Sequence, residues 1–378
     1  MRALRIILSL LLLTLLLTPV WFQLTKFKWA NALNGYEVQL DTVRLNLNTL
    51  RSLEWQNYMH ETGKSKLRLR SFLIRLNNQL KYSLFGQVGL QRIEKGKDGH
   101  FYTKVTIDSY FGRNYIGEDN IRDSVAALTV IRDSLQAYGT ELIIVVAPGK
   151  AFIYPEYIPD QLVRETRDTS NYDIYSKELE KADFPFIDFI PVFLQMKDTA
   201  VYPIMPKAAV HWSIYAASVA ADSVLIHLER LIGKPLPKVA ERKIQTSFFP
   251  KHTDGDIADV LNLLDMASQE RYAYPIVTKV NEEGTFRPNI LAISDSYYWS
   301  LIHNHVPDNF FSDRSQYYFY FKDIYPTKTR PVKSVDSINN LKEDLCSRDV
   351  IILMTSDGTL QKFPYGFISK ANQAFGIE

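Results

Sequence analysis

The chain has 378 residues, of which 46% are hydrophobic and 13% aromatic, so it encodes a packed globular protein rather than a disordered one. Its 44 basic and 42 acidic residues leave a formal net charge of +2, without a basic stripe or a zinc-spaced Cys/His set, which argues against nucleic-acid binding. Cys346 is the only cysteine, which excludes an intrachain disulfide and a thiolate metal cluster.

The N-terminus carries an apolar run over residues 6–22, preceded by Arg2 and Arg5. Its length is at the short end for a bilayer-spanning helix, and the arginines favour a cytoplasmic N-terminus. We therefore predict an uncleaved single-pass anchor in the inner membrane, with the main domain in the periplasm. The alternative is a signal peptide cleaved after Ala-Asn-Ala at residues 30–32. In both cases the rest of the chain is exported.

Three regions follow from the pattern along the chain: residues 1–32 as anchor or signal, 33–95 as a helical lead-in segment, and 96–378 as an α/β domain. Residues 33–85 carry apolar side chains at helical spacings. The Gly-Lys-Asp-Gly sequence at 96–99 predicts a turn between two strand-like pieces.

From residue 121 onward, helical and strand patterns alternate. Helices are predicted over residues 121–138, 213–232 and 257–266, and strands over residues 142–147, 186–189, 290–293 and 350–354. The tyrosine-rich run 316–321 reads as a buried strand, with a sugar-binding cleft as the alternative. This alternation predicts a mainly parallel sheet, whose functional site forms at the carboxyl ends of the strands. Ser296 and Lys150 each follow a predicted strand and are placed at that edge.

Ser296 and His211 are the candidate nucleophile and base. A serine hydroxyl becomes reactive when a base takes its proton and nearby donors stabilise the oxyanion that forms. Ser296 lies where an apolar run breaks into Ser-Asp-Ser, which fits a turn between a strand and a helix. Each signal is weak by itself, because Ser-Asp-Ser can be a helix N-cap and His-Trp can be a packed core pair.

Five motifs occur in a fixed order. They are Arg-Ser-Phe-Leu-Ile-Arg-Leu-Asn from 70 with Leu-Phe-Gly at 84–86, Gly-Lys-Asp-Gly-His-Phe-Tyr at 96–102, Val-Val-Ala-Pro-Gly-Lys at 145–150 with Tyr-Pro at 154–155, His-Trp-Ser at 211–213, and Ser-Asp-Ser-Tyr at 294–297. In this order they resemble the SGNH-hydrolase-like acetyltransferases of the alginate AlgJ/AlgX type. The resemblance covers most of residues 50–378.

The resemblance implies a flavodoxin-like α/β core in the periplasm that uses Ser–His–Asp chemistry to move acetyl groups onto polysaccharide hydroxyls, without a cofactor or metal. It also implies a multipass membrane O-acyltransferase partner as acetyl donor. By correspondence, Ser296 is the nucleophile and His211 the base, and Asp295 matches the family's aspartate beside the serine. The candidate substrate or oxyanion residues are Lys150, Tyr297 and Trp212, of which Trp212 matches a packing residue.

The chain departs from the family pattern at the acid that should orient His211. Ala209 occupies the aspartate position of Asp-x-His, and Ala208 occupies the alternative position three residues before the histidine. Ser294 also replaces the glycine of the nucleophile turn. An orienting acid fixes the imidazole tautomer and stabilises the imidazolium. The sequence leaves Asp198, Asp222, Asp295 or a backbone carbonyl as possible substitutes.

Three functions remain open at this point. The first is a membrane-anchored O-acetyltransferase acting on an exported polysaccharide, and the second is an acetyl esterase that uses water as acceptor. The third, motivated by Ala209 and Ser294, is a non-catalytic member that binds glycan or acts as a scaffold. His303 and His305 have the spacing of one strand face, but no third ligand stands at a usual offset, so no metal is predicted.

Overall fold

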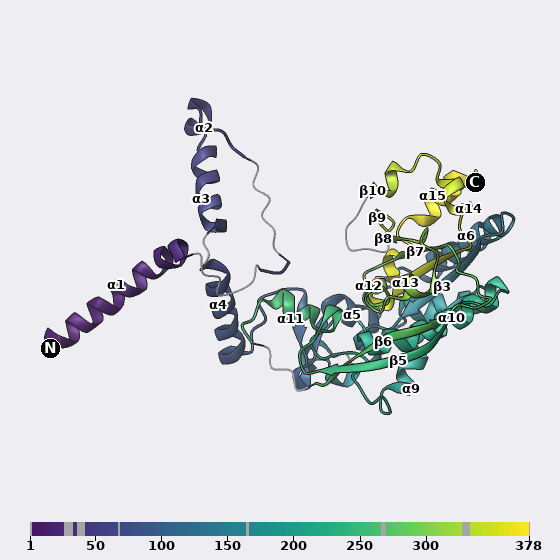
Figure 1. The fold of residues 1–378 in the computed structure, drawn as a ribbon, viewed down its shortest axis with the longest axis horizontal. Coiled ribbons are helices and arrows are strands. Elements are labelled where there is room, and N and C mark those ends of the chain that lie inside the picture. Colours follow the sequence, from purple (N-terminus) through teal and green to yellow (C-terminus); the bar gives the residue numbers. More distant parts are fainter. Residues whose placement is uncertain are drawn as a thin grey trace. The chain divides into compact units, whose positions relative to one another are not determined.

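The computed structural model describes residues 2–25, 33–35, 42–66, 69–163, 166–265, 270–326 and 333–377. The chain divides into two compact units (Figure 1). Unit 1 comprises Met1–Gln91 with Ala258–Ala267, and unit 2 comprises Arg92–Ile257 with Ser268–Glu378. The predicted lead-in segment ending at residue 95 thus corresponds to most of unit 1, which also takes in a later piece of the chain.

Unit 1 is helical, with α1 (Arg2–Thr25), α2 (Leu47–Arg51), α3 (Glu54–Lys66) and α4 (Arg70–Phe85). The helical prediction for residues 33–85 is wrong for 42–46, where extended Asn46 caps α2 through its side chain. Residues 36–41 and 67–68 lie outside the described residues. Within the described part of the chain, no helix is both long and apolar enough to cross a membrane. The anchor over residues 6–22, which α1 contains, stays a prediction.

Unit 2 is built on a seven-stranded sheet in the order β10-β9-β8-β7-β11-β3-β4. Neighbouring strands from β8 to β4 are parallel, whereas β9 and β10 add antiparallel pairings at one edge, so the sheet is mixed. The strands are β3 (Glu141–Ala147), β4 (Phe186–Asp188), β7 (Ile290–Ser294), β8 (Gln316–Phe319), β9 (Asp323–Pro326), β10 (Lys333–Ser334) and β11 (Val350–Ser356). The strands predicted at 142–147, 290–293 and 350–354 are confirmed.

The parallel strands have the flavodoxin order when they are counted from β7. Counted in this way, β7, β8, β11, β3 and β4 lie in the spatial order 2-1-3-4-5 that flavodoxin-like proteins share. Along the chain, however, β3 and β4 come first. The predicted flavodoxin-like arrangement is therefore present in space but circularly permuted in sequence, which is why His211 precedes the Ser296 turn.

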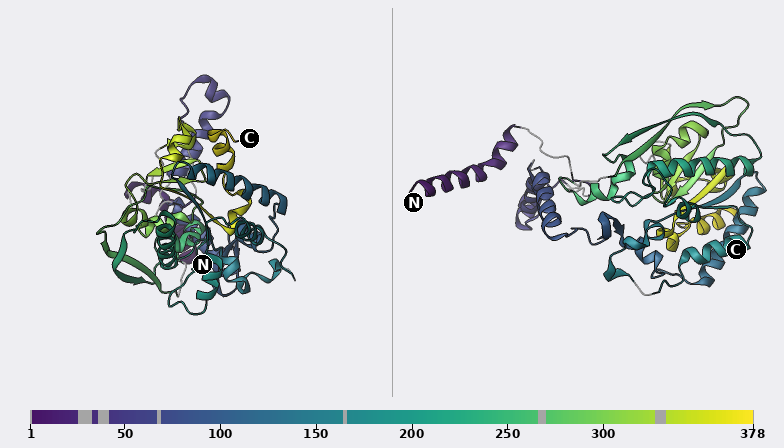
Figure 2. Two further views of the ribbon diagram at one scale, coloured as in Figure 1. Left: turned by 90° about the vertical axis from the view of Figure 1, so that its right-hand side faces the viewer. Right: turned by 90° about the horizontal axis from the view of Figure 1, so that it is seen from below.

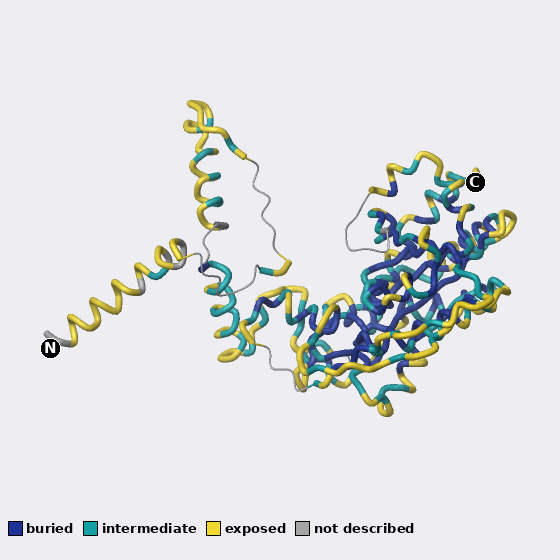
Figure 3. Tube along the Cα trace, viewed as in Figure 1, coloured by how far each residue is buried: buried dark blue, intermediate teal, exposed yellow. Residues whose placement is uncertain are grey.

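Helices cover both faces of the sheet (Figure 2). Side chains alternate between the faces along each strand: Val145 packs into one apolar core and Ile144 into the other. The first core is closed by α9 (Phe189–Met196), α10 (Ile214–Ile232), α12 (Tyr298–His303) and α13 (Val306–Phe310), and the second by α6 (Glu118–Gln136), α8 (Asn171–Lys181), α14 (Leu341–Cys346) and α15 (Phe367–Phe375). The central strands are accordingly buried throughout (Figure 3).

Several element boundaries differ from the sequence prediction. The strand predicted at 186–189 ends at Asp188, whose side chain caps α9. The helix predicted at 257–266 is α11 (Asp256–Leu261), and Met266 lies outside the described residues. The long antiparallel pair β5 (Lys238–Ser247) and β6 (Tyr272–Asn281) was not predicted. β5 is largely polar and exposed and gives no apolar run, whereas the apolar start of β6 was overlooked. The predicted turn at 96–99 does join β1 (Ile93–Lys95) to β2 (Phe101–Thr103).

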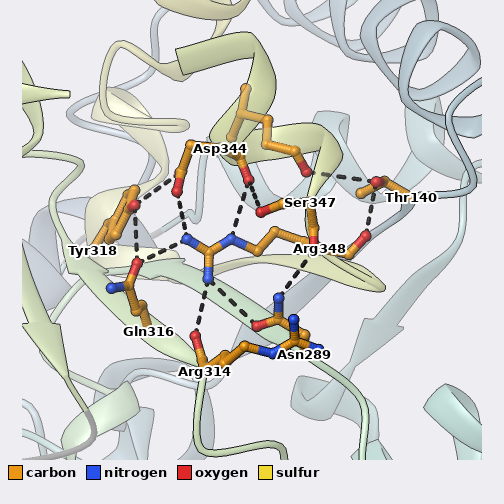
Figure 4. A network of polar contacts seen from close by, with 9 residues as sticks. Thr140, Asn289, Arg314, Gln316, Tyr318, Asp344, Ser347 and Arg348 are labelled. Carbon is orange, nitrogen blue, oxygen red and sulfur yellow. Dashed lines mark hydrogen bonds and ion pairs between the residues drawn. The ribbon is translucent and has the colours of Figure 1, made fainter. Parts of the chain in front are cut away.

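The amino ends of the strands are tied together by Arg348, which is 7% exposed (Figure 4). Its guanidinium donates to the side chains of Asp344 (2.5 Å) and Gln316 (2.8 Å), and to the carbonyl of Arg314 (3.1 Å). The backbone carbonyl of Arg348 in turn accepts a bond from the Thr140 hydroxyl. This network links the segments that enter β3, β8 and β11.

Candidate active site

The carboxyl ends of the parallel strands bring the candidate residues to one edge of the sheet. Ser296 follows β7, Lys150 follows β3, Tyr320 follows β8 and Asp357 follows β11. The sequence-based placement of Ser296 and Lys150 at this edge is confirmed. Tyr320, in contrast, was assigned to a continuous strand, whereas β8 ends at Phe319.

The structure brings Ser296 and His211 into direct contact. Nε2 of His211 lies 2.7 Å from Oγ of Ser296. His211 stands just before α10, whose N-terminus is capped by the Ser213 side chain. The histidine is 8% exposed and Ser296 is partly exposed, so the hydroxyl stands at an accessible edge while the base is shielded. This is the geometry that a serine nucleophile and its general base require.

Asp256 supplies the acid that the sequence left unassigned. Its Oδ2 makes a very short contact with Nδ1 of His211, and its Oδ1 accepts the backbone N–H of Val210 at 2.7 Å. Asp256 opens α11, directly after the 3₁₀ turn η4 (His252–Gly255). Asp222, one of the substitutes considered, pairs instead with Arg242 at 2.6 Å. The acid thus comes from a segment 45 residues beyond the histidine.

Asp295 has a different set of partners. Its Oδ2 accepts bonds from the hydroxyls of Ser356 (2.8 Å) and Thr359 (2.6 Å) and from the Ser356 backbone N–H, and its Oδ1 accepts the N–H of Tyr297. These bonds connect the nucleophile turn to the end of β11. The geometry therefore gives Asp295 a positioning role, because the histidine already has an acid in Asp256.

Lys150 is 1% exposed and has all three ammonium hydrogens directed at backbone carbonyls. Its Nζ donates to Phe101 (2.9 Å), Lys207 (2.9 Å) and Ala209 (2.5 Å). Burial lowers the pKa of this lysine to about 7. Since Ala209 is two residues from His211, Lys150 braces the loop that carries the base, rather than offering a free donor to a substrate.

Tyr297 and Trp212 pack beside the histidine. The ring of Tyr297 lies 4.8 Å from that of His211, and its hydroxyl donates to the carbonyl of Val210 at 3.0 Å. Trp212 is fully buried against Phe189 and Phe193. Both side chains therefore support the His211 loop from the core side.

A pocket of about 1110 Å³ begins beside the nucleophile turn. Tyr320, Tyr365 and Thr359 are among its lining residues, and the Thr359 hydroxyl donates to Asp295 of the nucleophile turn at 2.6 Å. Its wall also carries the basic residues Arg92, Lys104, Lys322 and Lys362 and the acidic residues Asp108 and Asp323. Asp108 is paired with Arg113 at 3.2 Å, so the wall has an excess of positive charge.

The histidines singled out by spacing, His303 and His305, line one pocket but have different partners. His303 stacks on His252 with 4.5 Å between ring centroids, whereas His305 pairs with Asp308 at 3.2 Å. Burial lowers the pKa of His303 to about 4. Among the described residues, no three His, Cys, Asp or Glu side chains are arranged to hold a metal ion.

The permuted doubly wound sheet and the Ser–His–Asp arrangement at its carboxyl edge define an SGNH-hydrolase-like α/β protein. Residues 93–287 match the family described as SGNH hydrolase-like domain, acetyltransferase AlgX. This stretch covers half of the chain, and the chain belongs to that family. It includes His211 and Asp256 but ends before Ser296, so Ser296 is a candidate nucleophile on its geometry alone.

Curated relatives include a probable alginate O-acetylase AlgJ of Pseudomonas syringae pv. tomato, 26% identical over 145 residues, which are 38% of this chain and 35% of that protein. The corresponding protein of Pseudomonas putida is 24% identical over 43% of this chain and 41% of its own length. The matches thus span about two fifths of these relatives or less.

Two solved structures are similar at low identity. The O-acetyltransferase domain of Pseudomonas putida AlgJ is 16% identical, with a TM-score of 0.48 over 75% of this chain and 99% of that one. Bacillus cereus PatB1 with a sulfonyl adduct is 12% identical, with a TM-score of 0.46 over 71% of this chain and 97% of that one.

Proposed function

We propose that this protein is an exported, membrane-anchored O-acetyltransferase that moves acetyl groups onto hydroxyls of a polysaccharide through an acetyl-Ser296 intermediate. The observation that carries the proposal is the Ser296–His211–Asp256 arrangement, with 2.7 Å between the serine oxygen and Nε2. The non-catalytic alternative was motivated by Ser294 in the nucleophile turn and by the missing acid at Ala209. Asp256 answers the second point, since it contacts the other ring nitrogen of His211.

In the first half-reaction, Oγ of Ser296 attacks the carbonyl carbon of the acetyl donor, and its proton passes to Nε2 of His211. Asp256 holds the imidazole and stabilises its protonated form. The donor's leaving group departs with the proton from His211, and acetyl-Ser296 remains. In the second half-reaction, a sugar hydroxyl gives its proton to His211, attacks the acetyl carbon and leaves as the acetyl ester, while Ser296 recovers its proton.

The pocket beside the nucleophile turn is our candidate acceptor site. Aromatic side chains such as Tyr320 and Tyr365 offer flat surfaces for sugar rings, and four basic residues offer charge to an acidic polymer. Hydrogen bonds and ion pairs between basic side chains and carboxylates are strong when partly shielded from water. We therefore propose that the acceptor is an acidic polysaccharide, as the names of the AlgJ relatives indicate for those proteins.

The proposal includes a position in the cell and a partner. The apolar run over residues 6–22 would anchor the chain in the inner membrane, and the α/β unit would work in the periplasm. Acetyl would be supplied by a multipass membrane O-acyltransferase. This topology predicts that a protease added to the periplasmic side releases the α/β unit, while the N-terminal segment stays in the membrane fraction. Recovery of the intact chain in the periplasmic fluid would contradict it.

The test is acetyl transfer from 4-nitrophenyl acetate by the full chain, with and without oligouronates as acceptor. We expect ester formation on the oligouronate, and its loss in Ser296→Ala and His211→Ala. Ser124→Ala, on α6, is the matched control and keeps full activity. Equal activity of Ser296→Ala and the wild type would refute the proposal. Turnover that releases only free acetate at every acceptor concentration would instead identify an esterase.

A further inference from the structure

Tyr320 occupies a backbone conformation that aromatic residues rarely adopt. Its φ is +48°, and that of Phe321 is +53°, so two consecutive non-glycine residues are left-handed at the end of β8. The Tyr320 N–H bonds the carbonyl of Ser294 at 2.8 Å, and Phe321 is 1% exposed in the core. The surrounding structure thus enforces this turn, and such enforced strain concentrates at functional sites.

The consequence of the turn is that the Tyr320 side chain reaches the nucleophile. Its hydroxyl lies near enough to the Ser296 side chain for the two to interact, and the side chain also lines the candidate acceptor pocket. The ring is held by Phe319 and Tyr365, with centroid distances of 4.5 Å and 5.1 Å. The hydroxyl is therefore held on a rigid support beside the atom that attacks the acetyl group.

Partial burial raises the pKa of Tyr320 to about 12. The phenol consequently stays protonated at neutral pH and can donate a hydrogen bond. A donor that is fixed before the reaction, next to the place where negative charge develops, stabilises that charge without reorganisation. The other candidates for this role do not have a free donor here: Lys150 is bonded to three carbonyls, and the Tyr297 hydroxyl is bonded to Val210.

We propose that Tyr320 is a catalytic residue whose hydroxyl donates a hydrogen bond to the oxyanion formed when Ser296 adds to the acetyl carbonyl. The inference rests on the proposed function. As the bond from Oγ to carbon forms, the carbonyl π electrons move to oxygen, the serine proton goes to His211, and Tyr320 keeps its own proton. When the oxyanion collapses, its electrons re-form the carbonyl and the leaving group takes the proton from His211.

The test compares Tyr320→Phe with the wild type in hydrolysis of 4-nitrophenyl acetate. The variant keeps the ring contacts and loses one donor, and we expect kcat/KM to fall roughly 10²- to 10³-fold, as for other oxyanion donors. The fall should lie in kcat, with KM changed less than about twofold. The matched control is Tyr318→Phe, within β8, whose hydroxyl bonds Asp344 at 2.8 Å instead (Figure 4).

A second readout uses a trifluoromethyl ketone, which forms a tetrahedral adduct with a serine nucleophile. If Tyr320 stabilises the oxyanion, the inhibition constant rises in Tyr320→Phe by about the factor by which kcat/KM falls. A variant with more than half of the wild-type kcat/KM would overturn the inference, as would a rise in KM alone. Ser296→Ala separates the two proposals: if it is inactive while Tyr320→Phe is active, only the role of Tyr320 fails.

Discussion

The two edges of the central sheet use buried polar groups in opposite ways. At the amino edge, Arg348 and its partners form a closed network in which every guanidinium nitrogen has an acceptor (Figure 4). At the carboxyl edge, the Ser294 hydroxyl and the Trp212 indole N–H are buried without a hydrogen-bond partner among the described residues. The aromatic residues Tyr320, Phe321 and Tyr365 are also left-handed there.

The difference indicates what each edge contributes. A network in which every polar group is hydrogen-bonded holds the strand ends together and contributes to stability. Each buried polar group there has a protein partner in place of the water that it loses on folding. Strained backbone and incomplete hydrogen bonding cost stability, and they persist at the carboxyl edge, where Ser296, His211 and Tyr320 lie. Substitutions at the carboxyl edge should therefore mainly lower activity, whereas substitutions at the amino edge should mainly lower stability.

The largest effect is expected from Asp256→Asn at the carboxyl edge. The amide keeps the shape but cannot stabilise the imidazolium and favours the wrong tautomer, so kcat should fall roughly 10³- to 10⁴-fold. Steady-state kinetics with 4-nitrophenyl acetate measure this. Asp222→Asn, at a carboxylate that pairs with Arg242, is the control and should keep wild-type kcat. A loss of kcat in Asp222→Asn, with kcat unchanged in Asp256→Asn, would reverse the assignment of the orienting acid.

The next effect is at the amino edge, where Arg348→Met removes the centre of the network. Asp344 and Gln316 would lose their charged partner, so the free energy of unfolding should drop by about 2–3 kcal/mol, somewhat below the value for a fully buried pair because Asp344 is partly exposed. Chemical denaturation measures the drop. The kcat of the folded protein should be unchanged, and a kcat reduced tenfold would show that the edges are coupled.

A smaller catalytic effect is expected from Lys150→Met, which removes the brace on the His211 loop. The carbonyls of Phe101, Lys207 and Ala209 lose a shared donor, so the imidazole should be slightly misplaced and kcat should fall roughly 10- to 100-fold. KM should change little, because Lys150 has no exposed face for substrate. A higher KM at unchanged kcat would instead place Lys150 in substrate binding.

The smallest effect concerns the pH dependence of stability at the carboxyl edge. Burial raises the pKa of Asp357 from 3.8 to about 7, so the folded state retains a proton that the unfolded state loses. Between pH 4 and pH 7 the stability of the wild type should thus decrease as pH rises, relative to that of Asp357→Asn. Denaturation at several pH values measures this difference. The exposed control Asp313→Asn should follow the wild type, and parallel curves for Asp357→Asn would contradict the prediction.

The sequence predicted the parts of the molecule whose signals are local. The strands ending before Ser296 and Lys150 are apolar runs buried on both faces, and their alternation with helices placed both residues at the correct edge. The five ordered motifs identified the family that residues 93–287 match.

The sequence could not predict pairings between distant segments. Asp256 reaches His211 from 45 residues away, and its only local signal was an acidic residue at the start of the helix predicted from residue 257. Tyr320 was predicted to lie in a strand because aromatic residues favour strands. In the structure β8 ends at Phe319, and Tyr320 begins a left-handed turn. β5 carries too few buried residues to produce a strand pattern.

The most direct test of the central claim is to trap the acetyl-enzyme. The full chain is mixed with 4-nitrophenyl acetate, quenched in acid, digested and analysed by peptide mass spectrometry. We predict one acetyl ester on Ser296, formed rapidly in the wild type, far more slowly in His211→Ala and Asp256→Asn, and absent in Ser296→Ala. Acetylation at another residue, or an equal rate of Ser296 acetylation in the His211 and Asp256 variants, would contradict the assignment of this triad.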